Sequence, residues 1–329
     1  MQNNMPSRED LAEVAFLYYI RNMNQQDIAS YLGVSRPVVS RMLATARDDG
    51  VVTFSIDFPM QRRADLESEI LGGWQGSKLK DVIVVEESTD GLGTSNQAGL
   101  SPGMLSVAQA GAGWLERQVF PGVQIGLSWG STAQTVIDLA RFDRRIDATV
   151  VQLAGEVSFS GVQPAYELVR QLSEKLGANY QYLSVPASAP TKEIARILVE
   201  TTNLRDSLER AGQCDVAVLG VGALGSGSTD AFLKIANASA EELQEAQEAG
   251  VVGQISSLLF NSDGQEADIA LNSRLFSVSL DQIRKIPEVA LVAVGPEKAR
   301  AVSGALNGSL GSSLIVDVPL AEKILEVRN

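Results

Sequence analysis

The sequence predicts an α/β protein in which a small all-helical domain precedes a larger domain built on a Rossmann-like parallel sheet. In the first part of the chain, apolar residues recur at helical spacing between short turn signals. In the remainder, short β-branched runs alternate with helical stretches of ten or more residues. At 329 residues and 45% hydrophobic side chains, the chain is long enough to bury a core in each domain. We place the domains at residues 1–58 and 79–329, joined by a linker helix within residues 59–78.

Capping residues divide the N-terminal domain into three helices. Ser7 can cap a first helix over residues 8–23, which is apolar nearly all round and is therefore expected to be buried on more than one side. Asn24 can cap a second helix that ends in a left-handed stop at Gly33. Ser35 can cap a third helix, so the last two helices are joined by a Gly-Val-Ser turn.

The third helix has two different sides when its residues are placed at 100° intervals. One side is apolar and suits packing against the first two helices; it consists of Val38, Val39, Met42, Leu43 and Ala46. The other side carries three arginines and no acidic residue; it consists of Arg36, Pro37, Ser40, Arg41, Ala44, Thr45 and Arg47. These are the features of a recognition helix that enters the major groove of DNA.

We interpret the pair of helices over residues 25–44 as a helix-turn-helix, and the alternative is a three-helix bundle used for protein contacts. The expected contacts to DNA are Gln25, Ser35, Arg36, Pro37, Ser40, Arg41 and Arg47. Charge supports DNA binding only locally, because residues 1–60 have a net charge of −2 and the rest of the chain −11. We therefore expect operator DNA to be bound by a few placed arginines and helix N-termini in a homo-oligomer, either a dimer or a tetramer.

In the remainder of the chain, short apolar runs alternate with helical stretches, which is typical of a parallel sheet covered by helices. A short strand or wing is expected over residues 51–59, a linking helix over 61–74, and a polar Gly/Ser-rich loop over 88–103. Seven apolar runs are predicted as strands: residues 81–85, 123–127, 149–155, 180–185, 215–222, 289–295 and 313–318.

Ligands of open α/β sheets bind beyond the carboxyl ends of the strands, so the residues that follow each run are candidate site residues. After the run 123–127, residues 128–132 read Ser-Trp-Gly-Ser-Thr and lead into a helix, where hydroxyls and free backbone N–H groups suit a phosphate. Lys298 is expected in the first turn of a later helix, where a cation opposes the helix dipole unless an anion compensates it. The alternatives are an ordinary strand-to-helix turn and a solvated lysine.

The segments that follow two other predicted strands also carry small or polar residues. One contains Gly222 and Asp230, and the other contains Pro186 and Ala187. Asp230 and Asp317 are candidate acceptors for sugar hydroxyls, although either side chain can also serve only as a helix N-cap.

Composition excludes several classes of function. Without histidine, the chain cannot assemble Ser-His-Asp or Cys-His catalysis or a histidine-ligated zinc site. Cys214 is the single cysteine, which excludes an intramolecular disulfide and a multi-thiolate metal site, and we expect a buried, inert thiol. The sequence lacks a signal peptide pattern and an apolar stretch of about 20 residues, so we expect a cytoplasmic protein.

The two parts together resemble the SorC/DeoR family of bacterial transcriptional regulators, whose effector domain is similar to sugar-phosphate isomerases. The residues that carry the resemblance are "LYYIRNMNQQDIASYLGVSRPVVSRMLATARDDGVV", "IGLSWGST", "VVQLAGEV", "VGALGSGST" and the tail that begins "LDQIRKIPEVALVAVGPEKARAV". The chain departs from the family at Ala154-Gly155, where relatives often have two glycines, and in the tail segment "IVDVPLA".

The resemblance implies a DNA-binding regulator whose operator affinity responds to a phosphorylated sugar or polyol, with no catalytic residue, metal or cofactor. It implies that phosphate is held by Ser128, Gly130, Ser131, Thr132 and Lys298. It implies that Gln152, Pro186, Ala187 and Asp230 line the sugar end; Gly155 and Gly222 are the other candidates for ligand contact. The alternative is a sugar-phosphate isomerase or lactonase-like enzyme with an accessory helical domain, which the absence of histidine disfavours.

Overall fold

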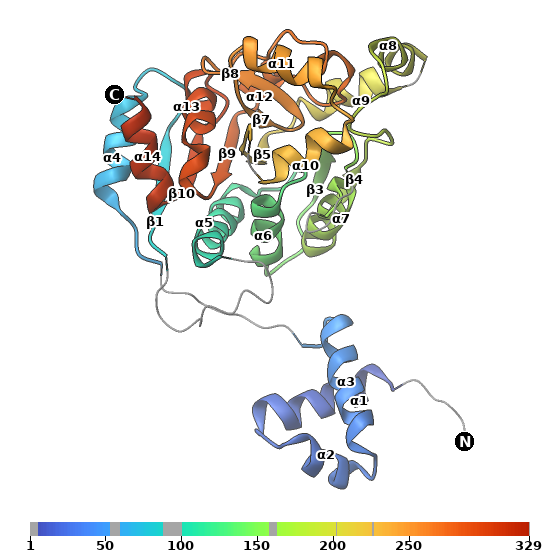
Figure 1. Ribbon diagram of the computed structural model, residues 1–329. Helices are drawn as coiled ribbons and strands as arrows, with labels where there is room; N and C mark the ends of the chain where they lie inside the picture. The colour runs from blue at the N-terminus through green and yellow to red at the C-terminus, as the bar shows by residue number, and fades with distance from the viewer. Residues whose placement is uncertain are drawn as a thin grey trace. The chain divides into compact units, whose positions relative to one another are not determined.

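The computed structural model describes residues 6–52, 60–87, 101–157, 163–201, 203–225 and 227–328. Contacts between residues divide the chain into two compact units, Met1–Asp57 and Phe58–Asn329 (Figure 1). The predicted boundary at residue 58 and most of the predicted wing over residues 51–59 lie outside the described residues. The same holds for residues 88–100 of the predicted loop, whose last two residues already belong to helix α5 (Pro102–Gln118).

Local capping explains the helices of the smaller unit, α1 (Arg8–Ala15), α2 (Gln25–Leu32) and α3 (Arg36–Asp48). Ser7 and Asp10 form a capping box at the start of α1. The Asn24 side chain accepts hydrogen bonds from the backbone N–H groups of Gln26 and Asp27, and Gly33 ends α2 with a φ of +67°. These three caps confirm the sequence-based prediction.

The side chain of Ser35 does not cap α3 as the sequence predicts. It occupies the N-cap position of α3 with an extended backbone, but its side chain accepts no capping hydrogen bond. An N-cap side chain normally accepts from the second or third helical residue, and here the second is Pro37, which has no N–H. The N–H of Val38 bonds instead to the Ser35 carbonyl at 2.9 Å. The exposed Ser35 hydroxyl is therefore not used by the helix.

The core of the smaller unit confirms the apolar side of α3. Val39 and Leu43 are buried against Val14 of α1 and Ile28 of α2. The first helix differs from its prediction, because α1 passes into one π-helical turn over Phe16–Ile20, at which the helix ends. Phe16 is 47% exposed and Ile20 is 67% exposed, so the expectation that this helix is buried on more than one side is wrong for its second half.

The larger unit is built on a seven-stranded sheet in which every neighbouring pair is parallel. All seven predicted runs contribute a strand to it. In spatial order the strands are β1 (Asp81–Val85), β10 (Ser313–Asp317), β9 (Glu288–Ala293), β5 (Val216–Gly220), β2 (Val123–Leu127), β3 (Ala148–Gln152) and β4 (Asn179–Gln181). β4 has only three residues, and the second half of its predicted run, up to Val185, continues as a loop.

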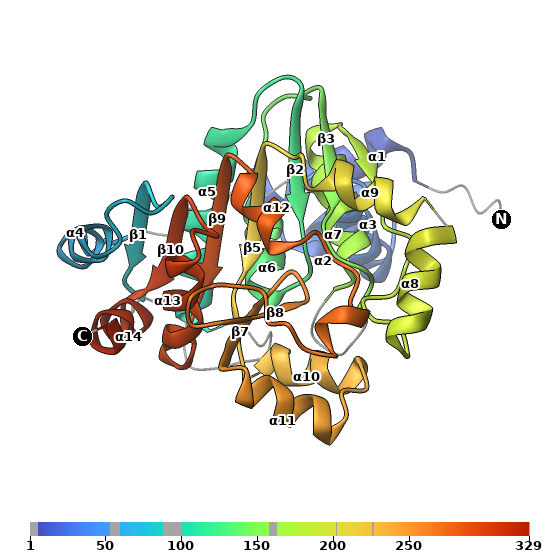
Figure 2. The same ribbon diagram turned by 90° about the horizontal axis from the view of Figure 1, so that it is seen from above.

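Helices cover both faces of this sheet (Figure 2). In β5, Val216 and Val218 face one apolar cluster, and Ala217 and Leu219 face another, as the two-residue period of a strand requires. On one face lie α5, α6 (Ser131–Leu139) and α7 (Ala165–Leu176). On the other lie α4 (Ala64–Gly73), α12 (Leu280–Lys285), α13 (Ala299–Asn307) and α14 (Val318–Arg328).

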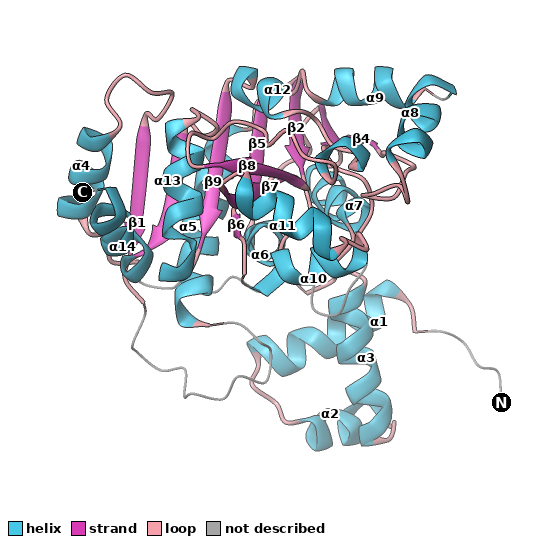
Figure 3. Ribbon diagram, turned by 45° about the horizontal axis from the view of Figure 1, so that its top comes forward, coloured by secondary structure: helices cyan, strands magenta, loops and turns pink. Residues whose placement is uncertain are grey.

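A second, antiparallel sheet was not expected from the sequence. It consists of β6 (Gly222–Ala223), β7 (Val251–Ile255) and β8 (Leu258–Asn261), and Figure 3 shows β8 running across the direction of the main strands. β7 and β8 are joined by the turn Ser256-Ser257, whose φ angles are +49° and +75°. Hairpin turns with positive φ usually contain glycine or asparagine, so Ser-Ser gave no turn signal.

The described part of the larger unit also contains the α-helices α8 (Lys192–Thr201), α9 (Leu204–Ala211), α10 (Gly227–Ile235) and α11 (Ala240–Glu248). The helix predicted within the linker is α4, and it packs within this unit. Its Leu66 and Ile70 are buried, and Trp74, which follows it, donates a 2.8 Å hydrogen bond to Asn307 on α13. Cys214 is buried, as predicted.

Candidate functional site

The exposed side of α3 carries the residues predicted to contact DNA. Arg36, Pro37, Ser40, Arg41 and Arg47 are all exposed, and so is Ser35 at the start of the helix; Gln25 on α2 is half-buried. Within residues 6–52 the structure shows no ion pair to any of the three arginines on α3. Their charges are therefore available to an anionic partner such as a DNA phosphate.

A pocket at the carboxyl edge of the main sheet brings together segments that are far apart in the sequence; we call it the edge pocket. It lies where β2, β5 and β9 end and where the β7–β8 hairpin turns back over them. Its lining residues are Trp129, Gly130, Ser131, Thr132, Gly220, Val221, Gly222, Ser228, Gln254, Ser256, Val292 and Lys298. Five of these, at positions 130, 131, 132, 222 and 298, are predicted ligand contacts.

The exit of β2 forms one wall of the edge pocket. Gly130 has a φ of +150°, a conformation that suits glycine, and it occupies the N-cap position of α6 without a side chain that could close the helix end. Ser131 and Thr132 open α6 and line the pocket, and the free backbone N–H groups and the dipole at the start of a helix favour an anion. Trp129 ties this wall to the hairpin, because its indole N–H donates a 3.0 Å hydrogen bond to the Ser257 hydroxyl.

Lys298 lines another part of the edge pocket. It ends a 3₁₀ turn over Pro296–Lys298 and is the N-cap of α13, one residue before the helix in which it was predicted. Its side chain is half-buried, and burial lowers the pKa of its ammonium group, which the negative charges of Glu297 and Asp317 partly oppose. A cation held at a helix start and away from water is stabilised by a bound anion.

Asp317 is not among the residues that line the pocket, but it contacts Gly295, which precedes the 3₁₀ turn that carries Lys298. It is buried at the end of β10, and both of its carboxylate oxygens accept the backbone N–H of Gly295, at 3.2 and 3.3 Å. Burial raises the pKa of the Asp317 carboxyl, and hydrogen bonds from the backbone of Gly295 and Leu320 oppose that rise. Of its two predicted roles, the structure shows the capping one.

Unpaired polar atoms gather around the edge pocket. Gln254 Nε2 and Ser256 Oγ line it, and Ser128 Oγ lies beside Trp129; all three are buried and have no hydrogen-bond partner among the described residues. Thr229 Oγ1 is also buried and unpaired, and it lies against Gly222, where a Cβ would approach it to 2.2 Å. Each buried polar group without a partner costs about 1–3 kcal/mol, which a ligand with hydroxyl or phosphate groups would recover.

The other predicted ligand contacts lie outside the edge pocket. Gln152 is buried at the end of β3, where its Nε2 donates to Ala154 O at 2.7 Å and to Glu156 Oε1 at 2.6 Å, and its Oε1 accepts the Leu183 N–H at 3.1 Å. Both amide protons of Gln152 are therefore used within the protein. Asp230 accepts the Gly225 N–H at 3.1 Å and lines a separate cleft between α10 and α11.

Gly155, Pro186 and Ala187 mark a close approach of two loops. A Cβ on Gly155 would lie 2.3 Å from the carbonyl oxygen of Pro186, so the exits of β3 and β4 can pass this closely only with glycine at position 155. Ala187 is buried and its N–H bonds to the Glu156 carbonyl at 2.9 Å. These residues shape the loops beside the edge pocket.

Gln254, Ser256 and Trp129 were missed as candidate contacts. Gln254 and Ser256 belong to the hairpin that the sequence did not predict, and they are polar residues within the apolar segment "VVGQISSLLF". That interruption of an apolar run is the signal that could have singled them out, because buried polar side chains need a partner.

Both units match known protein families. Residues 62–326 match the family model described as "Putative sugar-binding domain", and residues 10–57 match a Crp-like helix-turn-helix domain. The chain is 28% identical to the deoxyribonucleoside regulator of Bacillus subtilis over 95% of its length and 96% of that protein. It is 26% identical to the sorbitol operon regulator of Klebsiella pneumoniae, over 96% of this chain and 97% of that one.

The fold agrees with a solved structure of the same kind. The full-length sorbitol operon regulator SorC from Klebsiella pneumoniae superposes with a TM-score of 0.68 at 22% identity, covering 97% of this chain and 99% of that one. These relatives are regulators and not enzymes, so the isomerase or lactonase alternative is not supported. Across the described ranges of the chain, no helix has the length and apolar character needed to cross a bilayer.

A helix-turn-helix unit followed by a sugar-binding effector domain is the arrangement that the sequence, the fold and these relatives share. The chain belongs to the SorC/DeoR family of transcriptional regulators and is a ligand-controlled DNA-binding protein with a sugar-binding domain.

Proposed function

We propose that the edge pocket binds the phosphate of a phosphorylated sugar or polyol and that this binding controls the affinity of α3 for operator DNA. The observation that carries the proposal is that the half-buried residue Lys298 lines the same pocket as the N-terminus of α6, at Gly130, Ser131 and Thr132. A cation and free backbone N–H groups form a phosphate site when they converge in a place with little water.

The unpaired atoms suggest how the rest of the ligand is held. We assign Gln254, Ser256, Thr229 and Ser128 to the hydroxyl or phosphate oxygens of the ligand, because their buried polar atoms have no partner among the described residues. Gln152 and Asp230 are already hydrogen-bonded within the protein and lie outside the pocket. Their proposed role, with Gly155, Pro186 and Ala187, is to hold the neighbouring loops in place.

The size of the pocket suggests how binding is linked to a change of conformation. Its enclosed part has a volume of about 30 Å³, room for about two water molecules, so a sugar phosphate can bury only a small part of itself there in this conformation. We propose that the walls formed by Ser228 at the start of α10 and by the β7–β8 turn move apart when the ligand binds. A ligand that binds the opened form better than the closed one shifts the protein toward the opened form.

On the DNA side, we propose that Arg36, Arg41 and Arg47 contact base edges or flanking phosphates in the major groove. The first turn of α3 contributes Ser35, whose hydroxyl makes no capping bond, and Pro37 and Ser40 are small enough for close approach. We also propose that Gln25, at the start of α2, contacts the phosphate backbone of the DNA. We propose that this binding takes place in the cytoplasm.

We predict that the protein is a dimer or a tetramer and that its operator is pseudo-palindromic. The smaller unit offers few cations, so one copy makes too few phosphate contacts for tight binding, and two copies double them. Light scattering on the purified protein at micromolar concentration should give the mass of at least two chains. A monomer that binds DNA tightly would contradict this prediction.

Gly222→Ala tests the ligand site with a small change. The new Cβ would lie 2.2 Å from Thr229 Oγ1 and 3.4 Å from Gln254 Oε1, so it fills the pocket wall. In calorimetric titrations with glucose 6-phosphate, ribose 5-phosphate and sorbitol 6-phosphate, we expect the tightest-binding compound to lose about tenfold or more in affinity.

Gly72→Ala is the matched control, because a Cβ on Gly72 of α4 has no atom within 4 Å. It should bind the same compound with unchanged affinity. If Gly222→Ala also binds unchanged, the ligand lies elsewhere. Turnover of any of the three compounds would revive the enzyme alternative.

A further inference from the structure

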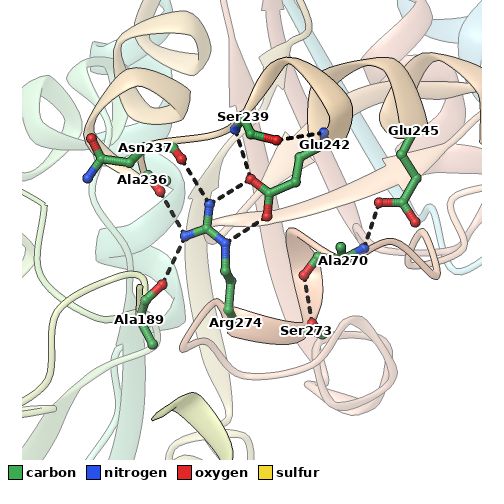
Figure 4. A network of polar contacts seen from close by, with 9 residues as sticks. All are labelled: Ala189, Ala236, Asn237, Ser239, Glu242, Glu245, Ala270, Ser273 and Arg274. Atoms are coloured by element: carbon green, nitrogen blue, oxygen red, sulfur yellow. Dashed lines mark hydrogen bonds and ion pairs between the residues drawn. The ribbon is translucent and has the colours of Figure 1, made fainter. Parts of the chain in front are cut away.

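The side chain of Arg274 links α11, the end of α10 and the loop that contains Ala189, as Figure 4 shows. We call this set of contacts the clamp. The Nε and Nη2 atoms of Arg274 bind the two carboxylate oxygens of Glu242 on α11, each at 2.8 Å. Its remaining donors bind carbonyl oxygens: Nη1 binds Ala189 O at 2.9 Å and Ala236 O at 2.8 Å, and Nη2 binds Asn237 O at 3.3 Å. All five N–H groups of the guanidinium are therefore used.

The clamp holds both ends of the connection between α10 and α11. Ala236 and Asn237 follow the last residue of α10, and Glu242 closes a capping box with Ser239 at the start of α11. A second contact lies beside the clamp, where the Glu245 carboxylate accepts the Ala270 N–H at 2.9 Å (Figure 4). The other end of α10 carries Ser228 and Thr229, so the clamp fixes the helix that forms one wall of the edge pocket.

The same stretch of chain also holds the hairpin and the loops after β3 and β4. We call residues 270–278 the anchor segment. Ser277 donates its hydroxyl to the carbonyl of Ser256 at the hairpin turn, and the Val278 N–H bonds to Leu153 O at 2.8 Å. The Phe276 N–H bonds to Ala187 O at 2.9 Å. Two walls of the edge pocket, α10 and the hairpin, are therefore attached to one segment.

The clamp differs in its energetics from an ordinary stabilising contact. The Arg274 side chain is 7% exposed and that of Glu242 is 15% exposed, so both charges lose much of their hydration. A buried ion pair often stabilises a fold no better than apolar residues of similar volume would. What the charged pair supplies is a fixed geometry, because a planar guanidinium with five donors accepts only one arrangement of its partners.

We propose that Arg274 and Glu242 are positioning residues that set the affinity of the edge pocket for its ligand by holding α10 against the pocket. This inference rests on the proposed ligand site. It assigns Arg274 no contact with the ligand, since Arg274 does not line the edge pocket. Loosening the clamp frees α10 together with Ser228 and Thr229, and so weakens the ligand contacts without touching them.

The test replaces the pair without leaving a buried charge alone. In the double variant Arg274→Met/Glu242→Leu, amide hydrogen exchange over residues 231–235 of α10 should speed up about tenfold while amides of β5 and β9 keep their wild-type rates. Titration with inorganic phosphate and with ribose 5-phosphate should show a dissociation constant raised about three- to tenfold. Arg274→Lys, which keeps the charge with fewer donors, should lie between wild type and the double variant.

Arg284→Met is the matched control. Arg284 also binds backbone carbonyls of two segments, Gly308 O at 2.8 Å and Gly264 O at 2.6 Å, but it has no link to α10. It should lower thermal stability and leave phosphate affinity unchanged. Wild-type exchange in α10 of the double variant, or acceleration spread evenly over the whole unit, would overturn the proposal. If the wild type binds neither phosphate compound, the proposed function fails, and the exchange measurement still decides the role of the clamp.

Discussion

Replacing Lys298 with alanine should abolish the response to a phosphorylated effector and leave the DNA affinity of the ligand-free protein nearly unchanged. Lys298 supplies the only lysine or arginine side chain among the residues that line the edge pocket. Losing one charged hydrogen bond to phosphate should weaken the ligand by about 1.5–3 kcal/mol, a factor of about 10–100 in the dissociation constant. A ligand acts on DNA only through its different affinities for two conformations. If the Lys298 contact is made in only one of them, removing it removes the coupling and leaves the DNA-contacting helix intact.

The measurement is a DNA-binding titration with and without the tightest-binding sugar phosphate, for the wild type, Lys298→Ala and Lys285→Ala. Lys285 is an exposed lysine on α12, so its variant should respond to the ligand as the wild type does. An unchanged response in Lys298→Ala would place the anion site elsewhere. Loss of DNA binding without ligand would show that the lysine is structural.

The pH dependence gives the same assignment a second test. Burial lowers the pKa of the Lys298 ammonium, so this group loses its charge at a lower pH than an ordinary lysine. Ligand affinity should therefore be highest below this lowered pKa, where the lysine is charged, and should fall as the pH rises through it. Lys298→Ala should lack this alkaline decline. A decline of equal size in the variant would assign it to another group.

Alanine at Arg36 or at Arg41 should weaken specific DNA binding by about 1–3 kcal/mol if the side chain contacts a base. Both guanidinium groups are exposed on the side of α3 that the core leaves free, and no ion pair within the described part of the smaller unit holds either of them. An arginine that contacts only phosphate should instead weaken binding to all sequences alike and reduce the slope of affinity against salt by about one.

Fluorescence anisotropy with a duplex selected by the protein from random sequences gives these affinities. Arg21→Ala is the control, because Arg21 lies after the first helix with its guanidinium over the Phe16 ring and outside α3. It should bind DNA with nearly wild-type affinity. Unchanged binding in both Arg36→Ala and Arg41→Ala would remove α3 as the reader.

Several features that the sequence predicted correctly are set by nearby residues or by the composition of one segment. Ser7, Asn24 and Gly33 act on backbone groups within a few positions, so their roles can be read from spacing. The parallel strands were identifiable because β-branched runs buried on both faces differ in composition from the helices between them. The rule that ligands bind beyond the carboxyl ends of strands also brought Gly130, Ser131, Thr132, Gly222 and Lys298 to one pocket.

Features that depend on distant partners could not be predicted. Gln254 and Ser256 join the pocket through a hairpin whose Ser-Ser turn has no glycine or asparagine. Gln152 was a reasonable ligand contact by its place at a strand end, but its amide is used by Glu156 and by the loop after β4. Arg274 donates a hydrogen bond to the carbonyl of Ala189, which is 85 positions away in the sequence. No local sequence pattern predicts such a contact.

The most direct test of the central claim is to measure DNA affinity and ligand binding in the same sample. The protein is titrated into a labelled duplex by anisotropy at zero and at saturating sugar phosphate, with saturation established by calorimetry. Ligand control of DNA binding predicts that the two DNA dissociation constants differ by a factor of about 5–150, and that Lys298→Ala removes the difference. Equal DNA affinities in the wild type, with the ligand demonstrably bound, would contradict the claim.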